Sequence, residues 1–96
     1  MTPENGGRIE LRLGQTTSDS AEYDAHLQTP RGSFRARVRV GGPEQVAFGA
    51  WSGDDQAGPP AWLTDDARAA LKAALRTNQS EGRWPRRITR WRPEPE

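Results

Sequence analysis

The strongest constraint on the fold of this chain is the alternation of apolar and polar residues through residues 21–40, AEYDAHLQTPRGSFRARVRV. A period of two on both sides of a Thr-Pro-Arg-Gly turn is typical of two β-strands with one buried and one solvent-facing side. Folding about this turn pairs Leu27 with Phe34 and Asp24 with Arg37. A shift by one residue would set apolar side chains opposite charged ones, so the sequence predicts a hairpin with a single register. The other predicted pairs are Tyr23 with Val38, Ala25 with Ala36, Glu22 with Arg39, and His26 with Arg35.

Residues 8–13 alternate in the same way and predict a strand beside the first arm of the hairpin. Two registers keep the apolar sides of the two strands together. One places Glu10 beside His26 and Arg12 beside Asp24, whereas the other places Glu10 against Asp24. A like-charge pair of that kind costs up to about 1 kcal/mol. We therefore expect the first register.

Residues 45–51 predict a fourth strand, next to the second arm of the hairpin. Phe48 and Ala50 would then face the core, because they follow the same alternation. Trp51 would lie on the solvent side of the sheet, near Arg35. We therefore expect Trp51 to present an exposed aromatic ring on the polar face.

Residues 52–60 are rich in glycine, proline and aspartate and separate this strand from a predicted helix. Thr64 is a suitable N-cap, and Asp65 and Asp66 follow it in the first turn, where the helix dipole favours acidic residues. We expect the helix to end near Asn78. Its narrow apolar stripe consists of Ala67, Leu71, Ala74 and Leu75, with Trp62 and Leu63 just ahead of it.

The last basic segment, residues 83–92 (RWPRRITRWR), is compatible with two conformations. Trp84, Ile88 and Trp91 would share one face of a helix, because they are four and three residues apart. Residues 87–92 are equally consistent with a short edge strand rich in arginine. The edge strand is the conformation that we expect.

Together these elements predict an α+β fold, a four-stranded antiparallel meander with one helix packed on one face. The basic C-terminal segment is a candidate for an additional short edge strand. The 96 residues correspond to a single small domain, in which we expect residues 1–7 and 93–96 to be mobile tails. A hydrophobic content of 32% is enough for one thin two-layer core.

The composition argues against several classes of protein. The chain has no cysteine, which excludes disulfides and thiolate metal sites. No apolar run approaches the length of a membrane span or of a signal-peptide core. The pairs Asp54-Asp55 and Asp65-Asp66 lack the spacing of an EF-hand, and no glycine-rich phosphate loop is present. We therefore expect a cytoplasmic protein without a metal, a cofactor or a membrane contact.

His26 is the single histidine of the chain, and it shares the predicted polar face with Asp24. A nucleophile–histidine–carboxylate arrangement needs a concave site, which the face of a flat sheet does not provide. We therefore expect no catalytic residue and no enzymatic activity.

Arg35, Arg37 and Arg39 form a ladder along the polar face, and the predicted position of Trp51 is beside this ladder. Tryptophan and arginine are enriched in the energetic centres of protein interfaces. The hairpin register gives the ladder acidic neighbours, and exposed ion pairs contribute only about 0–1 kcal/mol each, so a solvated structural role is the competing interpretation. As a functional hypothesis we favour a non-enzymatic binding module that uses these four residues to bind a protein partner with an acidic patch.

The alternative hypothesis is a nucleic-acid-associated accessory protein. Residues 68–92 hold eight basic side chains against Glu81 alone, and guanidinium groups can pair with phosphates while indole rings stack on bases. The net charge of only +1 argues against this class, and tryptophans in a chain this small are equally needed for its core. The residues that would contact nucleic acid are Arg83, Trp84, Arg86, Arg87, Arg90, Trp91 and Arg92.

Overall fold

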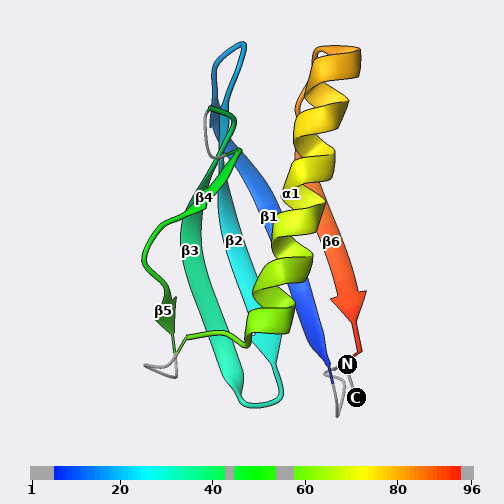
Figure 1. Cartoon of the computed structure of the whole chain (residues 1–96). Coiled ribbons are helices and arrows are strands. Elements are labelled where there is room, and N and C mark those ends of the chain that lie inside the picture. Colours follow the sequence, from blue (N-terminus) through cyan, green and yellow to red (C-terminus); the bar gives the residue numbers. More distant parts are fainter. Residues whose placement is uncertain (1–5, 43–44, 54–57, 94–96) are drawn as a thin grey trace.

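The computed structural model describes residues 6–42, 45–53 and 58–93, which form an antiparallel sheet and a helix (Figure 1). The elements are β1 (Gly7–Thr16), β2 (Ala21–Thr29), β3 (Gly32–Val40), β4 (Val46–Phe48), β5 (Ser52–Gly53), α1 (Ala61–Glu81) and β6 (Arg87–Arg92). The strand order is β4-β3-β2-β1-β6, and β5 also pairs with β3. The α+β class is confirmed. Within the described residues the sheet has six strands rather than four, because the predicted fourth strand is divided in two and the C-terminal segment adds another.

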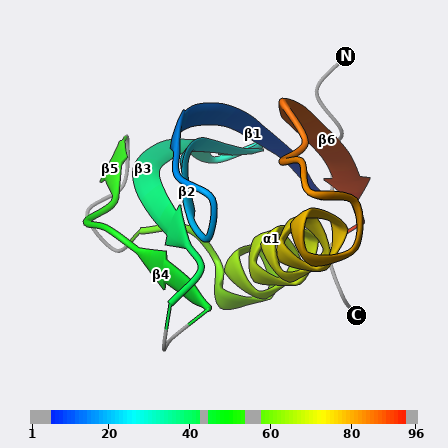
Figure 2. The same cartoon turned by 90° about the horizontal axis from the view of Figure 1, so that it is seen from above.

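Helix α1 covers one face of the sheet, and the strands curve around it (Figure 2). We call the face toward α1 the inner face and the opposite one the outer face. Because side chains alternate along each strand, the apolar residues of β1, β2 and β3 all point to the inner face. The fully buried large side chains come from both layers: Ile9, Leu11, Tyr23, Leu27, Val38, Val40, Leu63 and Leu71.

The predicted hairpin register is confirmed. β2 and β3 pair without interruption over nine residue pairs, and Leu27 lies opposite Phe34 on the inner face. β1 also takes the expected register, with Glu10 opposite His26. Alternation and charge pairing therefore determine the centre of the sheet.

A bulge separates β4 from β5, although both strands pair with β3. Phe48 lies opposite Val38, whereas Ser52 lies opposite Arg35, so residues 49–51 face only two residues of β3. One extra residue in a strand reverses the alternation that follows it. The predicted continuous fourth strand is therefore wrong beyond Phe48.

Helix α1 begins at Ala61, and the prediction that Thr64 is its N-cap is wrong. Pro60 occupies the N-cap position with φ −59° and ψ 143°, and its carbonyl oxygen accepts hydrogen bonds from the N–H groups of Leu63 and Thr64. The Thr64 hydroxyl also donates to this oxygen (3.3 Å) and caps no N–H group. The proline ring holds φ near the helical value, so the chain enters the helix earlier than a threonine cap predicts.

The helix ends at Glu81. The next residue, Gly82, adopts the left-handed conformation (φ 74°) and donates its N–H to the carbonyl oxygen of Asn78 (2.8 Å). Glycine tolerates this conformation without steric cost. Within the described residues, no helix is both long enough and apolar enough to cross a membrane.

β6 confirms the edge-strand conformation of the C-terminal segment. It pairs with β1 along its whole length, with Arg87 opposite Arg12. Ile88 points to the inner face and, together with Trp84, completes the core at 8% and 9% exposure. β1 begins at Gly7, and residues 1–5 and 94–96 of the predicted tails lie outside the described residues.

A buried tyrosine connects the hairpin to the segment before β6. The Tyr23 side chain is fully buried, and its hydroxyl donates a hydrogen bond to the carbonyl oxygen of Pro85 (2.6 Å). Burial disfavours the phenolate and raises the pKa of Tyr23 to about 12. The hydroxyl therefore remains protonated near neutral pH and holds the C-terminal segment against the hairpin.

Candidate functional site

The candidate site is the outer face of the sheet. Directly opposite residues of antiparallel strands point to the same side, so strand pairing brings the polar residues of β1, β2, β3 and β6 together on this face. The charged members that these four strands contribute to it are six arginines and three acids: Arg8, Arg12, Arg35, Arg37, Arg39, Arg87, Glu10, Glu22 and Asp24. With His26 neutral, this set carries an excess of three positive charges.

Glu10 is the centre of an ion-pair cluster that joins β1 to β6. Its carboxylate oxygens lie 3.2 Å from Arg8, 2.9 Å from Arg12 and 3.3 Å from Arg87, and its side chain is only 15% exposed. Burial alone would raise the pKa of Glu10, but the positive charges of Arg87 and Arg12 outweigh this effect and lower the pKa below its usual value. Glu10 is therefore ionised at neutral pH, and three guanidinium groups share one carboxylate.

The arginine ladder of β3 lies on the outer face. Arg37 pairs with Asp24 (Nε to Oδ1, 3.7 Å), and both side chains are well exposed, so this pair contributes at most about 1 kcal/mol. In the part of the chain that the structure describes, Arg35 and Arg39 have no carboxylate within 4.0 Å. Within those same residues, Arg37 is thus the one member of the ladder whose charge is paired with a carboxylate.

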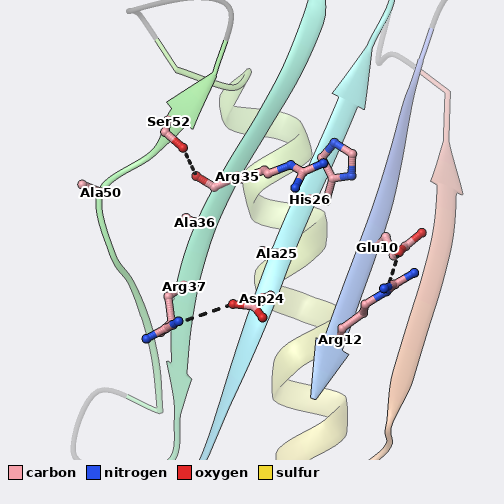
Figure 3. A pocket seen from close by; sticks show the side chains of 10 residues that line it. All are labelled: Glu10, Arg12, Asp24, Ala25, His26, Arg35, Ala36, Arg37, Ala50 and Ser52. Atoms are coloured by element: carbon pink, nitrogen blue, oxygen red, sulfur yellow. Dashed lines mark hydrogen bonds and ion pairs between the residues drawn. The ribbon is translucent and has the colours of Figure 1, made fainter. Parts of the chain in front are cut away.

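A shallow trough of about 720 Å³ crosses the outer face between β1 and residues 50–52 (Figure 3). Side chains of β1, β2 and β3 form its walls: Glu10, Arg12, Asp24, His26, Arg35 and Arg37. Ala50 and Ser52 line its border beyond β3. The small side chains at this border leave the trough open to solvent beside the ladder.

His26 lies in the trough, between Glu10 of β1 and Arg35 of β3. The Arg35 side chain extends toward the imidazole ring (Figure 3). The Nε2 atom of this ring is buried and has no hydrogen-bond partner among the described residues. Burial, followed by the positive charge of Arg35, lowers the pKa of His26, with a smaller contribution from Arg8 and an opposing one from Glu10. The imidazole is therefore neutral at pH 7.

Trp51, the expected aromatic anchor of the ladder, does not lie on the outer face. The bulge after Phe48 turns its ring to the inner side, where the ring is partly buried and packs on Phe48 with centroids 5.5 Å apart. Ala50 and Ser52 line the trough in its place. The predicted position of Trp51 beside Arg35 is therefore wrong, because one inserted residue exchanges the two sides of the strand.

The outer face presents Trp91 of β6 as an exposed aromatic side chain instead. Trp91 lies opposite Arg8 of β1, and it is 51% exposed. Its ring lies against Gly6, where an added Cβ would approach Cζ2 of the indole to 3.3 Å. The sequence placed Trp91 only in the alternative nucleic-acid segment, whereas strand pairing brings it to the same face as the ladder.

The residues of the predicted nucleic-acid segment lie in different environments of the structure. Trp84 belongs to the core, whereas Arg87 and Trp91 belong to the outer face. The remaining residues are exposed elsewhere: Arg83 and Arg86 before β6, and Arg90 and Arg92 on the side of β6 that carries Ile88.

In the described ranges, no group of three or more His, Cys, Asp or Glu side chains is placed to hold a metal ion. The pair Asp54-Asp55 lies outside those ranges. Asp65 and Asp66 lie within α1, past its first turn. The absence of enzymatic activity stays a prediction.

Comparisons with known proteins identify no relative of this chain. No protein-family model matches it, and searches of curated proteins and of solved structures find no significant match. The geometry and charge of the outer face are therefore the basis on which a function can be proposed.

Proposed function

We propose that this protein is a small, non-catalytic binding domain that engages an acidic patch of a protein partner through the outer face of its sheet. The observation that carries the proposal is the excess of positive charge on that face. Arg35 and Arg39 lack an ion-pair partner within the described residues. A guanidinium group that is free on a strand of a packed sheet can form bidentate hydrogen bonds with a carboxylate of the partner.

Trp91 supplies the aromatic surface that Trp51 was expected to provide. Its ring is half exposed and lies beside Arg8, so a partner that covers the indole also meets a guanidinium group. Tryptophan and arginine are both enriched at the energetic centres of interfaces. The proposed contact surface therefore extends from the ladder on β3, across the trough, to Trp91 on β6.

The mixed charge of the outer face favours a protein partner over a nucleic acid. Glu22 lies opposite Arg39, and Asp24 lies opposite Arg37, in the middle of the face. A phosphate backbone is uniformly negative and is repelled by these acids, whereas a protein surface can place basic groups opposite them. The pattern of charges is therefore better matched by a folded protein surface.

Nucleic-acid binding is the second candidate, and one observation supports it. Arg87 and Trp91 both lie on the outer face at its β6 edge, next to Arg8 and Arg12 of β1. One indole ring can stack on a base while neighbouring guanidinium groups contact phosphates. On this candidate, binding must weaken steeply with salt, because each phosphate contact releases a counterion.

Affinity capture with matched variants tests the first proposal. Proteins retained by the wild type are quantified by mass spectrometry and compared with those retained by Arg35→Glu/Arg37→Glu. The control, Lys72→Glu/Arg76→Glu, makes the same change of charge on the exposed side of α1. We expect acidic partners that are lost with the outer-face variant and retained by the control, whereas equal loss with both variants would contradict the proposal.

The second arm measures the affinity of the wild type for random DNA and RNA oligonucleotides over a range of salt concentrations. We expect no binding that competes with the protein partner. A log–log slope of about one unit for each phosphate contact, reduced in Arg87→Gln, would overturn the first proposal in favour of the second.

A further inference from the structure

Two unpaired groups meet in the trough where β2 and β3 place His26 opposite Arg35. The backbone carbonyl of Arg35 accepts a hydrogen bond from the Ser52 hydroxyl (3.4 Å). The guanidinium group of Arg35 has no carboxylate partner among the described residues. The Nε2 atom of His26 is buried without a hydrogen-bond partner in the same part of the chain. Leaving a buried polar atom unpaired is unfavourable, so a ligand that pairs with it gains affinity.

The charged neighbours of this corner are already engaged. From β1, Glu10 is shared by Arg8, Arg12 and Arg87. From β2 itself, Asp24 is engaged by Arg37. Among the described residues that line the trough, no further carboxylate therefore remains to neutralise Arg35. The third acid of the outer face, Glu22, lies opposite Arg39 and does not line the trough, so this corner has an excess of positive charge.

We propose that Arg35 and His26 form a subsite for one carboxylate side chain of the acidic partner, which binds together with a proton on His26. This inference rests on the function proposed above. The guanidinium group of Arg35 holds the carboxylate, and the protonated imidazole donates a hydrogen bond to it from Nε2. The proton comes from solvent, and the Arg35 side chain turns from the imidazole ring to the ligand.

Binding and protonation are coupled because each makes the other more favourable. In the free protein, burial and Arg35 lower the pKa of His26. A carboxylate beside the ring introduces the opposite charge and raises this pKa. A rise of one unit makes binding about tenfold tighter below the pKa of the free protein than above the pKa of the complex. Affinity therefore increases as pH falls through the interval between these two values.

A titration of the imidazole by proton NMR tests the subsite directly, because His26 is the single histidine of the chain. The probe is a hexaglutamate peptide, and the matched control is hexaglutamine. Between about pH 8 and about pH 5.5 the glutamates stay largely ionised. We expect hexaglutamate to raise the pKa of His26 and to bind up to about tenfold more tightly at the lower pH, whereas hexaglutamine does neither.

Three variants separate the subsite from a general effect of charge. Arg35→Gln should abolish the rise in the pKa of His26, and His26→Gln should make binding independent of pH. Arg39→Gln removes the same charge from the same strand and should weaken binding while the rise in pKa persists. Each change is at a solvent-facing position of the sheet, so all three variants should remain folded.

The outcomes distinguish this inference from the proposed function. Peptide-induced shifts of backbone amides across the outer face, with an unchanged pKa of His26, would overturn the subsite and leave the proposed function standing. The absence of any shift would overturn the subsite and count against the proposed function as well. A rise in pKa that survives in Arg35→Gln would also overturn it, because the carboxylate would then be held elsewhere.

Discussion

Replacing Trp51 with alanine separates a core role from an interface role for this residue. Truncation of a fully buried tryptophan costs about 3–5 kcal/mol. Trp51 is partly buried and packs on Phe48 at 5.5 Å between ring centroids, and an aromatic pair contributes about 0.5–1.5 kcal/mol of its own. We therefore expect Trp51→Ala to lower the free energy of unfolding by about 2 kcal/mol, intermediate between a buried and an exposed position.

The matched comparison is Trp91→Ala, which removes an indole of equal size from the outer face. Its half-exposed ring should contribute less than about 1 kcal/mol to folding. Urea unfolding followed by circular dichroism measures the free energy of unfolding of both variants. In thermal unfolding of a domain of this size, a loss of 2 kcal/mol lowers Tm by roughly 10 °C. Capture of the acidic partner should survive in Trp51→Ala and fail in Trp91→Ala. If Trp51→Ala were as stable as the wild type and lost the partner, the bulge that places Trp51 in the core would be refuted.

Three further changes test separate parts of the structure. Thr64→Ala should stay within about 0.5 kcal/mol of the wild type in urea unfolding, because Thr64 caps no N–H group; a loss of about 1 kcal/mol would mean that it does. The contribution of buried Tyr23 to the free energy of unfolding should be complete below pH 10.0, the pKa of this residue in the unfolded chain. It should be lost as pH rises to about 12, the pKa in the folded protein, because the native state binds more protons in this window. The absorbance of the single tyrosine reports the ionisation, and Tyr23→Phe should remove the dependence; a folded pKa of 10.0 would contradict the burial. Glu10→Gln should cost less than about 1 kcal/mol of stability and tighten the binding of hexaglutamate, measured by calorimetry, since it frees three guanidinium groups; weaker binding would show that Glu10 orders the face.

The centre of the sheet could be predicted from the sequence because the decisive information is local. In the hairpin, a slip of one residue places Val38 opposite Glu22 or Asp24, so no knowledge of the rest of the chain is needed. The register of β1 follows from one comparison of charge, in which Glu10 avoids Asp24. The excess of arginine on the outer face is a direct consequence of these pairings.

The errors arise where one residue changes the outcome. Residues 45–51 alternate as a regular strand would, and only Gly49 indicates the bulge. An added Cβ at Gly49 would lie 3.0 Å from the carbonyl oxygen of Arg37, and glycine inside a strand often marks such a close approach. Likewise, Pro60 carries the information about the start of α1, while Thr64 has the more familiar N-cap side chain.

The position of Trp91 could not be derived from its own segment. Whether its ring joins the core or the outer face depends on which strand β6 pairs with and in which register. The structure pairs Trp91 with Arg8, near the other end of the described chain. Local alternation contains no information about a contact between residues so far apart in the sequence. That the arginine ladder and part of the basic C-terminal segment share one face therefore could not be predicted.

The pairing of β1 with β6 also determines the order in which the molecule can be completed during synthesis. β1, the hairpin and α1 are all synthesised before residues 87–92. Until then the nascent chain has an open edge along β1 and lacks Ile88 from its core. Contacts between residues distant in sequence form slowly, and an unpaired strand edge invites association with other chains. A chain cut short before Arg87 should therefore aggregate, whereas in the finished protein the same edge is covered by a strand whose arginines discourage further pairing.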